Sequence, residues 1–297
     1  MLYQTKNEKL TKEKFEDPGS EFRGMPFWAW NCRPEMELLK KELDVLKEMG
    51  MGGAHIHSRV GLDIPYLGSE FMHDVKESEE YMKSKGMLCC LYDEDRWPSG
   101  SAGGMVTKDH QYRQRYLVIR PIDVQEKSSD TFLSAAAAVR SDEGQRLSLY
   151  EIKLDNKGFL SSYVRINGDE SDKGTHNIWE ARIEVSGDTP WFNNQAYVDV
   201  LNKDAIHRFI ELTHEKYYGI LGCDFGKEIR SVFTDEPQMS LKEVLEDPFE
   251  RKAVILPYTD NFDDTFSKAY GFSILDRLPE LVWELPENNV SVARYLF

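Results

Sequence analysis

Two short acidic segments, each directly after an apolar run, carry the strongest chemical signal in the sequence. The first follows MLCCLY and the second follows the run Ile229–Phe233. Hydrolysis of a glycosidic bond needs two carboxyl groups that flank it, and a partly apolar pocket can give one of them the raised pKa of a proton donor. The alternatives are a solvated acidic turn and a salt-bridged or capping pair. The catalytic candidates are Asp93, Glu94, Asp95, Asp235 and Glu236.

Aromatic side chains near other expected strand ends suit a sugar ligand. Trp97 follows the first acidic segment, where its flat ring could stack on the C–H face of a sugar or pack as a lid. Trp28 and Trp30 bracket the end of the run FWAW and precede Asn31. These three residues fit a sugar subsite, and they fit a hydrophobic core with a lid equally well.

A histidine pair gives a second class of site. His55 and His57 share one face of an expected strand, because successive strand side chains alternate between faces. They could contact sugar hydroxyls, pack in the core, or bind the metal ion of a metal-dependent hydrolase. The metal alternative needs ligands at later strand ends, and no ligand set is assigned. Asp199 and Asn202 in YVDVLN could end another strand and bind substrate, although Asn202 also fits a helix cap.

Alternating strand and helix patterns would position these residues. Apolar residues recur at three- and four-residue steps between Met36 and Met49, again from Ser69, and in Lys203–Leu221, which predicts helices. Gly50 and Gly86 can end the first two. The expected strands are FWAW (27–30), GGAHIH (52–57), MLCCLY (87–92) and IRSVFTDE (229–236).

This alternation favours a parallel α/β architecture, and acids at several strand ends favour a (β/α)8 TIM-type barrel over a doubly wound open sheet. No G-x-G-x-x-G or Walker pattern follows any strand. The barrel is expected to be incomplete, with an antiparallel β insertion, because few strand candidates are present. We expect a polar lead-in (1–21), first βα units (22–111), a β-rich insertion (112–191), and further βα units of a truncated barrel (192–297).

Composition limits the partners. The net charge of −15 argues against nucleic acid or an anionic membrane surface, because either would need a basic face. The sequence contains no apolar run long enough to span a membrane and no secretory signal at its beginning, which predicts a cytoplasmic protein. The cysteines have no CxxC spacing and are expected to be reduced. The sequence does not indicate the oligomeric state.

Several motifs together resemble a known family. FWAWN (27–31), GGAHIHSRVGLDIPYLGSEF (52–71), LYDEDRWPSGSAGG (91–104), YVDVLN (197–202) and VFTDEPQ (232–238) look like the barrel of glycoside hydrolase family 106, the α-L-rhamnosidase family. LPYTDNF (256–262) and YGFSILDRLPEL (270–281) are also similar. The matches run in order through most of the chain and skip the β-rich segment.

The resemblance implies a glycosidase that removes a terminal deoxysugar such as L-rhamnose from an oligosaccharide or glycoside. It implies an inverting mechanism and a calcium ion that can sit at the sugar site. It makes Glu236 the proton donor and a carboxylate of YDED the water-activating base, with Glu94 first. Family members are longer, so a non-catalytic carbohydrate-binding or scaffold protein is the main alternative, ahead of a metal-dependent hydrolase that uses His55 and His57.

Overall fold

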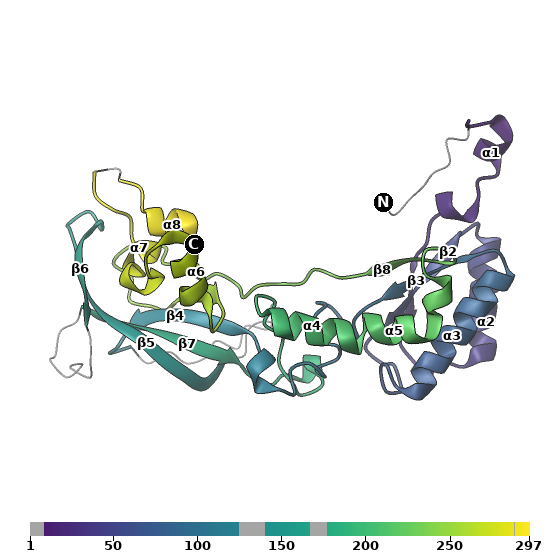
Figure 1. Cartoon of the computed structure of the whole chain (residues 1–297), viewed down its shortest axis with the longest axis horizontal. Helices are drawn as coiled ribbons and strands as arrows, with labels where there is room; N and C mark the ends of the chain where they lie inside the picture. The colour runs from purple at the N-terminus through teal and green to yellow at the C-terminus, as the bar shows by residue number, and fades with distance from the viewer. Residues whose placement is uncertain (1–8, 125–139, 167–176, 288) are drawn as a thin grey trace. The chain divides into compact units, whose positions relative to one another are not determined.

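The computed structural model describes residues 9–124, 140–166, 177–287 and 289–297. The chain divides into two compact units. Unit 1 runs to residue 106 and includes 204–237, and unit 2 contains 107–203 with 238–297. Each unit has its own sheet (Figure 1). Both acidic segments belong to unit 1.

Unit 1 contains a four-stranded parallel sheet in the order β1-β2-β3-β8. Its strands are β1 (Phe27–Trp30), β2 (Gly53–Ser58), β3 (Leu88–Tyr92) and β8 (Ile229–Phe233). The helices of this part of the chain are α1 (Lys12–Glu16), α2 (Met36–Glu48), α3 (Ser69–Ser84), α4 (Lys203–Leu212) and α5 (His214–Leu221).

Alternation along the strands gives the sheet of unit 1 two different faces. Trp28, Ile56 and Leu91 point to one face and form a buried core with apolar residues of α2, α3 and α5, which lie beside the sheet in Figure 1. Phe27 and Phe233 lie on the opposite face and keep 51% and 36% of their surface exposed. The sheet is therefore covered by helices on one side, and the other side carries partly exposed aromatic rings.

The helix ends match the sequence pattern. Gly50 and Gly86 follow α2 and α3 with φ of 84° and 68°, in the left-handed region that side chains with a Cβ rarely adopt. α3, the longest helix in the described residues, has 16 residues and carries many charges. No helix in the described part of the chain has the length and apolarity needed to cross a membrane. Residues 1–8 of the expected lead-in lie outside the described residues.

Unit 2 contains a five-stranded antiparallel sheet in the order β6-β5-β7-β4-β9. Leu117, Trp179 and Leu256 project from one face into a core shared with the C-terminal helices. The strands are β4 (Arg115–Pro121), β5 (Arg140–Leu154), β6 (Leu160–Ile166), β7 (Ile178–Ser186) and β9 (Val254–Tyr258). The helices are α6 (Phe262–Tyr270), α7 (Pro279–Val282) and α8 (Val292–Leu296).

The prediction of a (β/α)8 barrel is wrong. Within the described residues, parallel pairing of named strands is confined to β1, β2, β3 and β8. The strands expected as an insertion form most of a separate sheet, and β9 joins that sheet antiparallel to β4. The reason is that β9 buries Val254 and Leu256 in the core of unit 2. A short apolar run has the same pattern in a barrel strand and in an antiparallel strand.

Two local predictions also need correction. The expected helix Lys203–Leu221 is interrupted at Thr213, whose hydroxyl donates to the Phe209 carbonyl at 2.7 Å. Such back-bonding by threonine bends helices. YVDVLN forms no strand; its Val198 makes only an isolated bridge to Arg113. Strand-forming residue types are present there, but among the described residues no strand pairs with them in a continuous ladder.

Candidate active site

The register of β3 and β8 brings the two acidic segments together. Tyr92, the last residue of β3, pairs with Phe233, the last residue of β8. The Asp93 N–H donates to the Phe233 carbonyl at 3.1 Å, and the Ser99 N–H donates to the Asp235 carbonyl at 2.8 Å. Because parallel strands end at the same edge of a sheet, both sets of acids lie at one edge of unit 1. Their environments there differ.

Glu94 is buried in a ring of backbone amides. Its Oε2 accepts the N–H groups of Gly100, Ser101 and Ala102 at 3.0, 2.8 and 2.7 Å. Its Oε1 accepts those of residues 95 and 103. Burial raises the pKa of Glu94 to about 8, and the amide donors act in the opposite direction. A neutral carboxyl group would need an acceptor for its own proton, and five donors leave none. We therefore assign Glu94 as an ionised structural group.

Asp93 and Asp95 are also held by protein donors. Asp93 accepts the hydroxyls of Ser99 and Thr234 at 2.6 and 2.5 Å. Burial raises the pKa of Asp93. Asp95 accepts the Ser58 hydroxyl at 2.8 Å on one oxygen and the Arg96 guanidinium at 3.0 Å on the other. All three acids of YDED are thus at most 4% exposed and take part in local bonding.

Asp235 is half-buried, and only one of its two carboxylate oxygens accepts a hydrogen bond among the described residues. Its Oδ2 accepts the Tyr92 hydroxyl at 2.7 Å. Burial, followed by this bond to a carboxylate, raises the pKa of Tyr92 well above its usual range, so the phenol keeps its proton. The Asp235 N–H donates to the Ser99 hydroxyl at 2.8 Å, which fixes the backbone. The Oδ1 atom of Asp235 has no partner in the described part of the chain. One carboxylate oxygen thus remains for a ligand.

Glu236 is the exposed member of the five acids. Its Oε2 accepts the indole N–H of Trp97 at 3.0 Å. Its φ is 44°, in the left-handed region, although it precedes Pro237 and has a Cβ. Strain of this kind persists where neighbouring structure enforces it, and it is found most often at functional sites. The backbone turns Glu236 out of the sheet edge, beside an aromatic ring that suits a sugar face.

The two histidines of β2 lie on the face of the sheet opposite the helices, where both rings contact Phe27. His57 is 4% exposed and stacks on Tyr92, with ring centroids 3.7 Å apart. Burial, more than the nearby Arg59, lowers the pKa of His57 to about 4. Its Nε2 is buried and has no hydrogen-bond partner among the described residues. His55 Nδ1 lies 3.0 Å from the Met25 carbonyl oxygen, and burial lowers the pKa of His55 as well.

Several residues at this edge were not predicted. His214 at the start of α5 places Nε2 3.4 Å from Asp93 Oδ2. His214 lies inside the expected helix Lys203–Leu221, and the break at Thr213 is not visible in the apolar pattern. Ser58, Ser99 and Thr234 support the acids through their hydroxyls. The available signal was their position, because Ser58 ends β2, Thr234 follows β8 and Ser99 lies in the loop after β3.

Other predicted binding residues lie elsewhere. Trp28 and Trp30 are 7% and 2% exposed in the core of unit 1, and Trp28 donates its indole N–H to Glu42 at 2.7 Å. Both rings lie in the core of unit 1, because the alternation along β1 directs their side chains toward the helices. Asn31 is exposed at the end of β1. Two more candidates belong to unit 2: Asp199 and Asn202.

The described residues offer no ready metal site. They contain no group of three or more His, Cys, Asp or Glu side chains that could hold a metal ion. The oxygens of the YDED acids already accept protein donors, and His55 and His57 lack a third ligand of these types. The calcium ion implied by the family resemblance therefore does not fit the described residues, and nor does a zinc ion bound through the histidine pair.

Comparison with solved structures shows a similarity in fold. No family model and no curated protein matches the sequence. The solved structure of a rhamnosidase from Novosphingobium sp. PP1Y is similar, with a TM-score of 0.54 and 11% sequence identity over 94% of this chain. The match covers 43% of the rhamnosidase chain, so this chain spans less than half of that protein's length. At this identity the similarity concerns the fold, which is rhamnosidase-like.

Proposed function

We propose that this chain forms part of a glycoside hydrolase of the family 106 type, which removes a terminal deoxysugar such as L-rhamnose. One observation carries the proposal: at the edge of a rhamnosidase-like sheet, Glu236 alone among the five acids presents an exposed carboxyl group, bonded to the half-buried Trp97. A proton donor must reach the leaving oxygen, and a neighbouring aromatic ring can stack on the sugar.

In this proposal Glu236 protonates the glycosidic oxygen. Asp235 is the second carboxylate, because its Oδ1 has no partner in the described residues. It replaces Glu94 as the candidate base, since the lone pairs of Glu94 already accept five amides. Water activated by the second carboxylate would attack the anomeric carbon while the bond to the leaving oxygen breaks, with inversion expected.

The test is hydrolysis of 4-nitrophenyl α-L-rhamnopyranoside by the purified chain and by Glu236→Gln. Loss of a positioned acid or base costs about 10²–10⁴-fold in rate. An activated aryl leaving group needs less protonation, so a natural disaccharide should show the larger loss. Glu215→Gln is the matched control, because Glu215 is exposed on α5 of the same unit. Near-normal turnover by Glu236→Gln would refute the assignment.

The second candidate is a non-catalytic carbohydrate-binding protein. Its supporting observation is that all three YDED acids are engaged in structural bonds, which leaves few carboxylates for chemistry. Binding of L-rhamnose by the unmodified chain without any product release would favour this alternative. Binding should then weaken in Trp97→Ala and persist in Glu236→Gln.

A further inference from the structure

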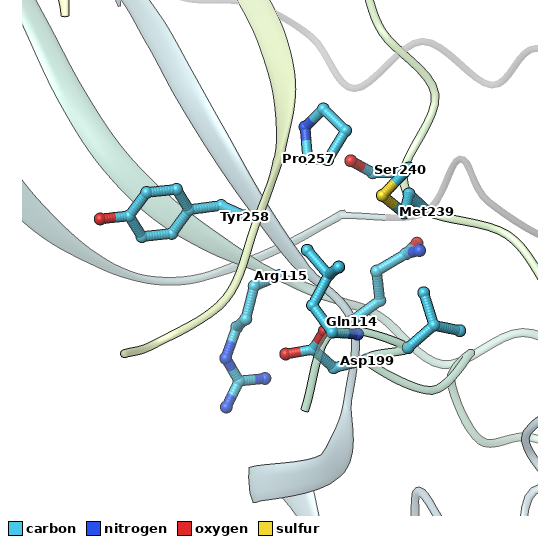
Figure 2. Close-up of a pocket in the computed structure, with 9 residues that line it drawn as sticks. Gln114, Arg115, Asp199, Met239, Ser240, Pro257 and Tyr258 are labelled. Atoms are coloured by element: carbon cyan, nitrogen blue, oxygen red, sulfur yellow. The ribbon is translucent and has the colours of Figure 1, made fainter. Parts of the chain in front are cut away.

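The hollow in unit 2 that Figure 2 shows is too narrow to hold a ligand. It lies where the start of β4, the end of β9 and the segment after Pro237 meet. The Gln114 side chain extends there toward Met239 and Ser240, and the hollow does not admit a water molecule. Exposed side chains of unit 1 are more accessible to a ligand.

Two phenylalanine rings form an exposed surface on the face of the unit 1 sheet that the helices leave open. Phe27 belongs to β1 and Phe233 to β8, the two outer strands of the described sheet. Their ring centroids are nevertheless 5.0 Å apart, so the rings meet across the two inner strands. Phe27 is 51% exposed and Phe233 is 36% exposed. We call this pair the phenylalanine platform.

Rings of the inner strands hold the platform in place. Phe27 packs edge-on against His55 and His57, with ring centroids 5.2 Å apart in each case. Phe233 stacks on Tyr92 at 5.9 Å, with an angle of 12° between the rings. Side chains that packing already orients lose little freedom when a ligand binds. The platform is therefore formed before any ligand arrives.

The platform adjoins the carboxylate that the proposed function assigns to water activation. Tyr92 connects the two, because its ring stacks on Phe233 and its hydroxyl donates to Asp235 Oδ2 at 2.7 Å. Phe233 also lies two residues before Asp235 in the chain. A sugar whose anomeric carbon lies at Asp235 can thus bring its neighbouring atoms to the platform.

The chemistry of the platform favours an apolar substituent. Phenylalanine has no side-chain hydrogen-bonding group, so a hydroxyl placed against it loses water without replacement. A methyl group loses no hydrogen bond there and gains from burial. In a pyranose only the ring oxygen separates the anomeric carbon from C5, which carries C6. That C6 substituent is a methyl group in a 6-deoxyhexose and a hydroxymethyl group in a hexose.

We propose that Phe27 and Phe233 determine the specificity of the site for a 6-deoxysugar by receiving its C6 methyl group. This inference rests on the proposed function and deepens it. It assigns the choice of sugar to two side chains that take no part in proton transfer, whereas Asp235 and Glu236 carry the chemistry.

The first test compares two substrates that differ only at C6, 4-nitrophenyl α-L-rhamnopyranoside and 4-nitrophenyl α-L-mannopyranoside. An apolar site rejects an added hydroxyl by about 10²-fold at most, so the unmodified chain should prefer the rhamnoside by roughly 10- to 100-fold in kcat/KM. Phe27→Gln places an amide beside C6 and should reduce this preference severalfold, whereas Phe27→Leu should keep most of it. Phe22→Gln is the matched control, because Phe22 is 69% exposed outside the sheet of the same unit.

The second test needs no turnover. Saturation-transfer NMR of the full chain with L-rhamnose, with irradiation of the aromatic protons of the protein, reports which sugar protons lie against its rings. We expect the strongest transfer at the C6 methyl protons. This transfer should fall in Phe27→Gln and persist in Phe22→Gln.

The two readouts separate this inference from the proposed function. Transfer to the methyl group without hydrolysis of either glycoside would refute the hydrolase and support the platform. Equal hydrolysis of the two glycosides, or a preference that Phe27→Gln leaves unchanged, would refute the platform and leave the hydrolase standing. If Phe27→Gln does not fold, Phe233→Gln replaces it with the same expected result. Absence of both the preference and the methyl transfer in the unmodified chain would also overturn the inference.

Discussion

The two acidic strand ends of unit 1 look alike in sequence and differ in structure. After β3, Asp93, Glu94 and Asp95 are at most 4% exposed, and donors of the protein occupy their oxygens. After β8, Asp235 keeps an oxygen without a partner in the described residues and Glu236 is exposed. The first end is built for stability and the second is available for a ligand. A carboxylate at a strand end is therefore not by itself a catalytic signal.

The difference arises from the residues that come after each strand. After β3 the chain turns back through SGSAGG, where Gly100 and Gly103 have φ of 137° and 62°. These conformations favour glycine, and they let successive N–H groups converge on Glu94. β8 ends at Phe233, and the segment that follows contains Pro237, which has no N–H to donate. A glycine-rich loop after an acid can thus mark a buried anion site formed by the protein's own side chain.

The largest expected effect is on stability at the first strand end. Glu94→Gln replaces one carboxylate oxygen with an NH₂ group that faces amide donors. Removing one partner of a buried charged network costs about 3–5 kcal/mol. Urea unfolding should show a midpoint shift of that size, or the variant should accumulate as unfolded protein.

The matched comparison is Glu236→Gln at the second strand end, where the side chain is exposed. Surface substitutions usually change stability by about 0.5 kcal/mol or less. If Glu94→Gln were as stable as Glu236→Gln and the loss of activity were larger for Glu94→Gln, the assigned roles of the two ends would have to be exchanged.

The second prediction concerns pH. His57 stacks on Tyr92, whose hydroxyl bonds to Asp235, and burial lowers its pKa from 6.5 to about 4. Between these values the unfolded chain binds more protons than the folded one. The free energy of unfolding is therefore highest above pH 6.5, where His57 is neutral in both states. It falls as the pH drops toward 4, because protonation then favours the unfolded chain. The expected total is about 3 kcal/mol, because a tenfold change in proton affinity is worth about 1.4 kcal/mol.

Thermal or urea unfolding across this pH range can isolate the contribution of His57. His57→Phe keeps a ring against Tyr92 and removes the titrating group, so the slope between pH 4 and 6.5 should be shallower than in the unmodified chain. His73→Gln is the control, because His73 is exposed on α3. Equal slopes for His57→Phe and the unmodified chain would show that His57 keeps its usual pKa in the folded protein.

The sequence predicted much of unit 1 because its signals are local. The runs that became β1, β2, β3 and β8 are apolar and are bounded by glycine or polar residues, and α2 and α3 have clear apolar stripes. The prediction of a barrel was wrong for a non-local reason. Whether VILPY in β9 pairs in parallel or antiparallel fashion depends on which sheet edge is free to pair with it in the folded chain. The burial of Glu94 could not be predicted for a similar reason. It depends on backbone amides six to nine residues further along the chain, which fold back onto the carboxylate.

The third prediction tests the link between the two strand ends. Ser99 donates its hydroxyl to Asp93 and accepts the N–H of Asp235, so Ser99→Ala leaves two groups without this partner. The expected loss is about 1–3 kcal/mol in the free energy of unfolding. Ser84→Ala serves as the control, because the Ser84 hydroxyl is exposed and bonds only locally to the Tyr81 carbonyl among the described residues. A loss no greater than that of the control would mean that the two ends are held independently.

The smallest expected effect concerns Trp97 and the second strand end. Trp97→Phe keeps an aromatic face and removes the indole N–H that Glu236 accepts at 3.0 Å. One such bond is worth about 1 kcal/mol, or roughly fivefold in kcat/KM if it orients the proton donor. The loss should fall mainly on kcat, with KM for the sugar little changed, because stacking remains. If KM rises and kcat does not change, the indole binds the sugar and does not position Glu236, and the second strand end would then be a binding surface first.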